Sequence, residues 1–131
     1  MATSFWGEGN IGSAPEVREF ANGNGGEPRR LLRLNVYFDN SVPKGNGEFE
    51  DRGGFWASVE LWHKDAQRFG ELYAKGMRVL VQGRMVLDKW EDEGGTERSA
   101  MKVQASRVGI LPHRLESVTL ALSGGAETAP F

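Results

Sequence analysis

The stretch FWASVELW, residues 55–62, decides the fold, because apolar residues recur at every second position along it, as they do in a β-strand. One face of this strand would carry Phe55, Ala57, Val59 and Leu61. The opposite face would carry Trp56, Ser58, Glu60 and Trp62. Since both tryptophans share a face with a serine and a glutamate, we expect their rings to point toward solvent.

The same alternation recurs on both sides of this stretch. Residues 32–39 precede it and predict a second half-buried strand, while residues 79–87 and 99–111 follow it and predict two more. Between them, residues 64–75 have apolar side chains at helical spacing, and Gly76 supplies a stop signal. The chain is therefore expected to form one helix among several strands.

Shorter segments complete this expected outline. Residues 3–8 and 13–20 are expected to be short strands, and residues 40–54 a long loop or the tip of a hairpin. Gly83 falls at an expected bend or bulge. Residues 115–122 fit a strand or a helix by their apolar spacing, and we favour a strand.

The resulting order is three or so strands, one helix and two strands, which predicts a mainly all-β protein. It matches the OB-fold, a partly open five-stranded barrel, with its helix between strands 3 and 4. We expect residues 1–112 to form this domain. Residues 113–131 would add a C-terminal element and a short flexible tail.

Composition limits the classes of function. The 131 residues suffice for one domain, and the absence of cysteine excludes disulfides and thiolate metal sites. No apolar run reaches the roughly 18 residues of a membrane span, and the first residues do not resemble a signal peptide. We expect a cytoplasmic protein with no membrane partner.

Candidate catalytic and metal-binding residues are sparse. His63 and His113 are isolated, and the acidic residues 91–93 lie in an expected turn without the ligand spacing of a calcium loop. No nucleophile with a neighbouring base can be named. We therefore expect no enzymatic activity, no cofactor and no metal.

Exposed aromatic residues form the strongest functional pattern. By strand parity, Trp56, Trp62, Trp90 and Tyr37 lie among polar residues. Each base of a single strand offers a flat face, so such rings can stack on it without demanding a particular sequence. Rings that cover a second small core, or that form a subunit interface, explain the pattern equally well.

Basic residues interleave with these rings. The candidates for phosphate contacts are Arg33, Arg84, Lys89, Arg98 and Lys102. The net charge of the chain is nevertheless −2, and acidic residues lie throughout. On charge alone, ordinary solvated side chains are the better explanation.

An ordered set of motifs resembles the bacterial single-stranded DNA-binding (SSB) proteins. Its parts are residues 9–12 (GNIG) with 15–18 (PEVR), Phe55-Trp56 with Trp62, residues 72–76 (LYAKG), 79–84 (VLVQGR) and 89–92 (KWED). The resemblance runs from about residue 5 to residue 111. It implies an OB-fold that wraps single-stranded DNA on aromatic rings, with Trp56, Trp62 and Trp90 at the family's stacking positions.

The chain also departs from that family. A further aromatic is usual near Asn40, and Tyr37 or Phe38 would have to replace it here. The family ends in an acidic tip that closes in Pro-Phe and recruits partner proteins. This chain ends in Pro130-Phe131 with few acids nearby, and a chance ending is the simpler explanation.

The resemblance implies a function and partners. The protein would bind single-stranded DNA with little sequence specificity and protect it in bacterial replication, recombination or repair, associated with the nucleoid. It would form a homodimer or homotetramer and meet replication or recombination proteins through its tail. The alternative is an OB-fold protein–protein interaction module of a replication or recombination complex.

Overall fold

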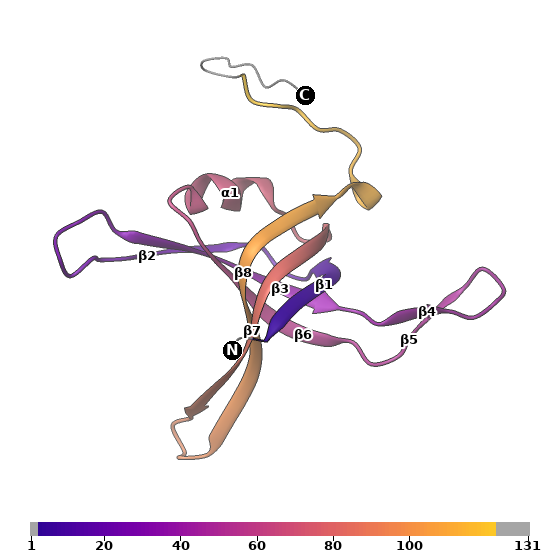
Figure 1. Cartoon of the computed structure of the whole chain (residues 1–131), viewed down its shortest axis with the longest axis horizontal. Helices are drawn as coiled ribbons and strands as arrows, with labels where there is room; N and C mark the ends of the chain where they lie inside the picture. The colour runs from indigo at the N-terminus through magenta and orange to yellow at the C-terminus, as the bar shows by residue number, and fades with distance from the viewer. Residues whose placement is uncertain (1–2, 123–131) are drawn as a thin grey trace.

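The computed structural model describes residues 3–122, in which five strands pair into a closed ring (Figure 1). The ring strands are β1 (Ser4–Ile11), β3 (Arg29–Phe38), β6 (Phe55–Trp62), β7 (Arg78–Glu91) and β8 (Glu97–Leu111). Strand β1 pairs with β7 and β3, β7 with β8, and β3 with β6, all antiparallel. A short parallel pairing of β6 with β8 closes the ring.

The helix α1 (Ala66–Leu72) lies between β6 and β7, which are the third and fourth strands of the ring. This confirms the predicted mainly β architecture with one helix at that position. The helix is shorter than the predicted 64–75, because the backbone is already extended at Tyr73. Gly76 has φ = +94°, a left-handed conformation that favours glycine, so its role is to turn the chain into β7 after the helix has ended.

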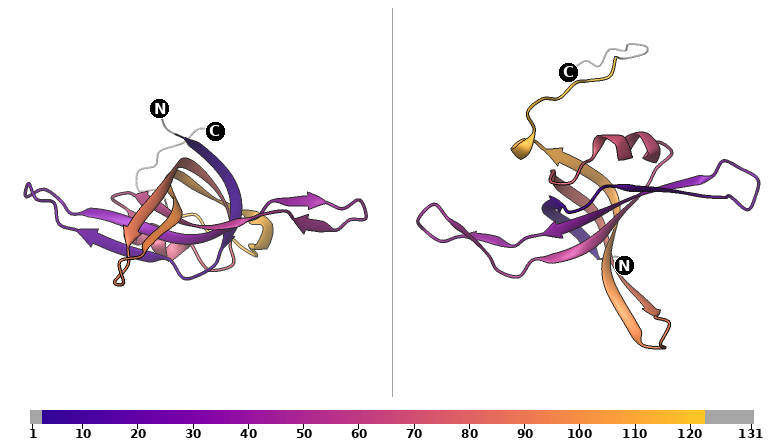
Figure 2. Two further views of the ribbon diagram at one scale, coloured as in Figure 1. Left: turned by 90° about the horizontal axis from the view of Figure 1, so that it is seen from below. Right: turned by 180° about the vertical axis from the view of Figure 1, so that it is seen from behind.

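Three hairpins project from the ring in different directions (Figures 1 and 2). Strand β2 (Glu16–Phe20) extends β3 on one side, as the predicted short edge strand. Strands β4 (Ser41–Pro43) and β5 (Phe49–Asp51) form a separate arm within the segment predicted to be a loop or hairpin tip. The far ends of β7 and β8 form the third arm.

The core fills the ring with the alternate residues that the sequence pattern predicted to face inward. They include Leu32, Leu34, Val36, Ala57, Val59, Val79, Val81 and Val103. Each fully buried valine or leucine contributes about 1.5–3 kcal/mol to folding. The residues that alternate with them along each strand therefore point outward, away from the core.

Gly83 lies at a bulge, as predicted, where the pairing of β7 with β8 shifts after Gln82. A Cβ at Gly83 would lie 2.3 Å from the backbone oxygen of Gln104, so only glycine lets the strands approach this closely. The bulge turns β7 and β8 out of the ring and into the projecting arm.

Two expectations about strands were wrong. Strand β1 continues through Gly9 to Ile11, because Gly9–Ile11 pair with β3. Residues 115–122 form no strand: after the short 3-10 helix η1 (Pro112–Arg114), Val118, Leu120 and Leu122 are exposed without a pairing partner. The tail residues Pro130 and Phe131 lie outside the described residues.

Candidate nucleic-acid interface

The outer face of β3 and β6 carries three of the four predicted stacking residues. The register places Tyr37 opposite Trp56, Asn35 opposite Ser58, Arg33 opposite Glu60 and Leu31 opposite Trp62. Directly opposed residues of an antiparallel pair share a face of the sheet. The face therefore has aromatic rings at both ends, about 20 Å apart, with polar residues between them.

Tyr37 and Trp56 form the first aromatic pair. Their ring centroids are 5.3 Å apart and their planes are inclined by 59°. The Trp56 side of the pair packs over Gly12, where a Cβ would lie 2.4 Å from the indole ring. Gly12 thus leaves room for the ring, and Trp56 remains 55% exposed on the predicted solvent side.

A hydrogen bond joins this aromatic pair to the base of the β4–β5 arm. The hydroxyl of Tyr37 donates to Asp51 Oδ2 over 2.5 Å, and the backbone N–H groups of Asn40 and Gly54 donate to Asp51 Oδ1. These donors hold the pKa of Asp51 below its usual range. The same carboxylate raises the pKa of Tyr37. Asp51 therefore positions the phenol ring.

Trp62 stands at the other end of the face and is 38% exposed. Phe20 of β2 lies beside it, with ring centroids 5.5 Å apart and planes inclined by 48°. The guanidinium carbon of Arg29 lies over the indole, 4.2 Å from its centroid. The alternation within β6 alone predicts neither neighbour, because Phe20 belongs to β2 and Arg29 to β3.

Glu60 occupies the middle of the face and is only 7% exposed. Its carboxylate binds Arg33 Nη2 at 3.1 Å and Lys102 Nζ at 3.5 Å, so it joins β3, β6 and β8. Two predicted phosphate-binding residues thus share one buried carboxylate. The cluster keeps one net positive charge, since two cations face one anion.

Trp90 lies on the projecting β7–β8 arm, opposite Arg98, and is 46% exposed. Its face also carries Arg84 and Lys102, and pairing of Lys102 with Ser58 connects this face to that of β6. Arg98 binds Asp92 at 2.8 Å, while Arg84 donates to the side chain of Gln104. Lys89 pairs with Ser99 and lies on the other face of the arm, apart from Trp90.

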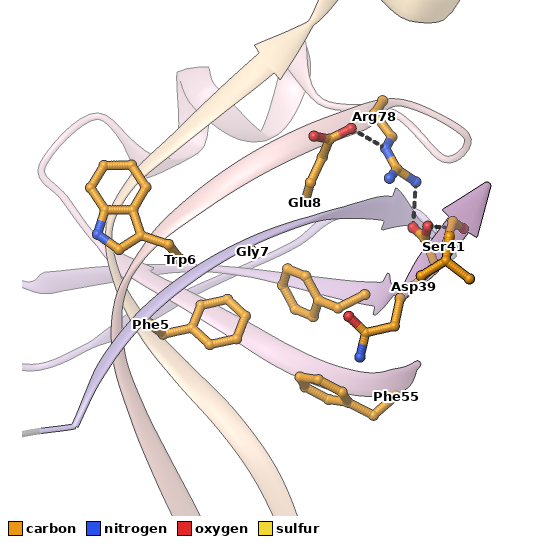
Figure 3. Close-up of a pocket in the computed structure, with 11 residues that line it drawn as sticks. Phe5, Trp6, Gly7, Glu8, Asp39, Ser41, Phe55 and Arg78 are labelled. Carbon is orange, nitrogen blue, oxygen red and sulfur yellow. Dashed lines mark hydrogen bonds and ion pairs between the residues drawn. The ribbon is translucent and has the colours of Figure 1, made fainter. Parts of the chain in front are cut away.

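A cavity of about 500 Å³ lies away from the β3–β6 face, beside β1 (Figure 3). In Figure 3, Phe5 and Phe55 point into it, while Trp6 points away from them. Arg78 binds Glu8 at 2.8 Å and Asp39 at 2.6 Å at its rim. Two carboxylates for one guanidinium leave this rim acidic, so it does not suit a phosphate.

Within residues 3–122, no helix is both long and apolar enough to cross a bilayer. No group of three or more His, Cys, Asp or Glu side chains in that range is arranged to hold a metal ion.

Comparison with known proteins by sequence identifies one family. Residues 6–111 match the model of the "Single-strand binding protein family". A protein of Corynebacterium glutamicum named single-stranded DNA-binding protein is 31% identical over 101 residues, 77% of this chain and 43% of that protein. The chain thus spans less than half the length of that relative.

Solved structures share the fold at lower sequence identity. A small single-stranded DNA-binding protein from Streptomyces coelicolor has a TM-score of 0.64 at 24% identity, over 84% of this chain and 94% of that one. The Plasmodium falciparum SSB in complex with ssDNA has a TM-score of 0.62 at 17% identity, over 85% of this chain and 96% of that one. These similarities confirm the predicted OB-fold.

Proposed function

Because the chain belongs to the single-strand binding protein family, we propose that it binds single-stranded DNA on the outer face of β3 and β6. The observation that carries this proposal is the exposure of Trp56 and Trp62 on one face, with a cationic cluster between them. The names of the relatives support the choice of ligand. The family is named for binding rather than catalysis, which supports the expectation that the chain is not an enzyme.

The proposed mode combines stacking with phosphate contacts. Bases stack on the Tyr37–Trp56 pair at one end and at Trp62 on the other, while Arg33 and Lys102 contact phosphates between them. Stacking contributes about 1–3 kcal/mol per base and tolerates any base, so little sequence preference is expected. Trp90, Arg84 and Arg98 extend the path onto the β7–β8 arm.

The charge balance makes stacking the larger contribution. Of the five predicted phosphate contacts, Arg33, Lys102 and Arg98 are already paired with carboxylates. Lys89 lies on the opposite face of its arm from Trp90. Few cations are therefore free to replace counterions around the DNA.

Such a protein would cover exposed single strands and protect them during bacterial replication, recombination or repair. Assembly as a homodimer or homotetramer is part of the proposal. The support comes from β1, which pairs with β7 along one edge. Along its other edge β3 pairs only with Gly9–Ile11, and no strand within residues 3–122 pairs with that edge at Ser4–Glu8. An open strand edge of this kind favours pairing with another chain.

The second candidate function is a protein–protein interaction module of a replication or recombination complex. It is favoured by exposed apolar side chains away from the proposed DNA face, namely Trp6 on β1 and Phe49 on the β4–β5 arm. Large exposed apolar side chains of this kind are common at protein interfaces. On this account the rings dock a protein and leave DNA unbound.

Titration with oligo-dT separates the two candidates. Single-stranded DNA should quench tryptophan fluorescence and saturate, and a duplex of the same length should bind much more weakly, because its bases are already stacked. Equal binding of single strand and duplex would contradict the stacking mode. Absence of any binding to either DNA would favour the protein-interaction module.

A further inference from the structure

Arg29, the first residue of β3, lies against the Trp62 ring. Trp62 is opposite Leu31, so Arg29 is its diagonal neighbour across the β3–β6 pair. The guanidinium carbon is over the indole at 4.2 Å from the ring centroid. Arg29 is also opposite Phe20, the other neighbour of this ring. The β3–β6 register therefore places Arg29 beside Trp62, and the β2–β3 register places Phe20 beside both.

No carboxylate within residues 3–122 pairs with Arg29, whereas two of its neighbours on β3 are paired. Arg30 binds Glu19 at 3.7 Å, and Arg33 binds Glu60 at 3.1 Å. Arg29 takes part in no ion pair within residues 3–122, and its side chain is exposed. The Trp62 ring is therefore the partner of the Arg29 guanidinium, and the side of the guanidinium that faces away from the ring is open to a ligand.

A guanidinium group over an indole presents a flat cationic surface. It is planar and weakly hydrated, so it stacks on aromatic rings and on bases alike, whereas a lysine ammonium is a compact, strongly hydrated point charge. A base that approaches the indole from the side of Arg29 meets the guanidinium before it meets the ring. The covered ring face is then not itself the stacking surface.

We propose that Arg29 receives a base of the bound single strand on its guanidinium plane, with Trp62 supporting it from behind. This inference rests on the proposed function and adds a base-binding residue to it. Phe20 contributes by restricting the Trp62 ring. The order at this end of the face is base, Arg29 and indole.

The test is the variant Arg29→Lys in the full chain, titrated with oligo-dT at several salt concentrations. Lysine keeps the charge and loses the plane, so affinity should fall about 3- to 10-fold, as expected for one cation–π contact, with an unchanged salt dependence. Arg68→Lys is the matched control. Arg68 is exposed on α1, away from the β3–β6 face, and its guanidinium carbon also lies over an aromatic ring, 5.1 Å from the centroid of Phe69, so its variant should bind like the wild type.

A double-mutant cycle with Trp62→Leu tests the support by the indole. If Arg29 acts together with the Trp62 ring, Arg29→Lys should lower the affinity for oligo-dT by less than about 2-fold in the Trp62→Leu background. Thermal unfolding of each variant checks that all remain folded.

Each outcome decides between the inference and the function beneath it. If Arg29→Lys binds like the wild type, Arg29 acts only as a charge, and if it binds more tightly, the bare indole is the stacking surface. Either result overturns the role of Arg29 and leaves the proposed function standing. If the wild type itself does not bind oligo-dT, the proposed function fails, and the role of Arg29 fails with it.

Discussion

Trp56→Ala is the substitution that best tests base stacking on this protein. The Trp56 side chain is 55% exposed and its indole rests on Gly12. Its removal therefore leaves the buried core between the strands untouched. Tyr37 stays in place, because its hydroxyl is held by Asp51. The variant should therefore fold, and its Tm should be close to that of the wild type.

The expected loss of affinity follows from what remains at the site. One stacked base contributes about 1–3 kcal/mol. Tyr37 lies 5.3 Å from the lost ring and can still offer a face to the base, so we expect the lower half of that range. A loss of about 1–2 kcal/mol corresponds to a Kd for oligo-dT that is roughly 5- to 30-fold higher.

The assay is fluorescence anisotropy of labelled oligo-dT at fixed salt. Trp6→Ala is the matched control, since Trp6 is the most exposed tryptophan, at 66%, and belongs to β1 rather than to the β3–β6 pair. It should bind like the wild type. A folded Trp56→Ala protein with unchanged affinity, or an equal loss in Trp6→Ala, would refute stacking at this position.

Three further predictions concern charge, pH and the support of Trp56. Log affinity for oligo-dT should fall linearly with log salt, with a shallow slope of about −0.7 per phosphate contact, and a salt-independent affinity would remove the phosphate contacts. The Tyr37–Asp51 contact should stabilise the β4–β5 arm at neutral pH, because the pKa of Asp51 is lowered and that of Tyr37 is raised. Its contribution should be lost as pH falls through the lowered pKa of Asp51 or rises through the raised pKa of Tyr37. In Asp51→Asn, one tyrosine should ionise at a lower pH than in the wild type, as followed by tyrosinate absorbance, and an unchanged titration would contradict the contact. Gly12→Ala should displace the Trp56 ring and cost part of the roughly 1–3 kcal/mol stacking contribution without unfolding the protein; wild-type affinity would show that the ring adjusts freely.

Strand parity was sufficient to predict which side chains fill the core and which rings face outward. Val59 is fully buried while Trp56 and Trp62 are exposed. Side chains alternate between the two faces of a strand, so once one face is buried, the position of each residue fixes whether it faces the core or solvent. The helix position was predictable for a similar reason, since its apolar spacing differs from that of the strands. Both features depend on local pattern alone.

Contacts between distant segments were not predictable from that pattern. Glu60 looked like a solvated residue, yet it is buried, because closure of the ring brings Arg33 and Lys102 to it from β3 and β8. The contact of Arg29 with Trp62 depends on the register between β3 and β6, which the pattern of neither strand contains by itself. Residues 115–122 show the converse error: their apolar spacing fits a strand, but no strand within residues 3–122 pairs with them.

Cross-linking tests the central claim most directly, that single-stranded DNA lies along the outer face of β3 and β6. Oligo-dT bound to the full chain is cross-linked by ultraviolet light, and the modified residues are identified by peptide mass spectrometry. We predict cross-links at Trp56, Tyr37 and Trp62, and none at Trp6. Cross-links confined to β1 or the β4–β5 arm would contradict the account.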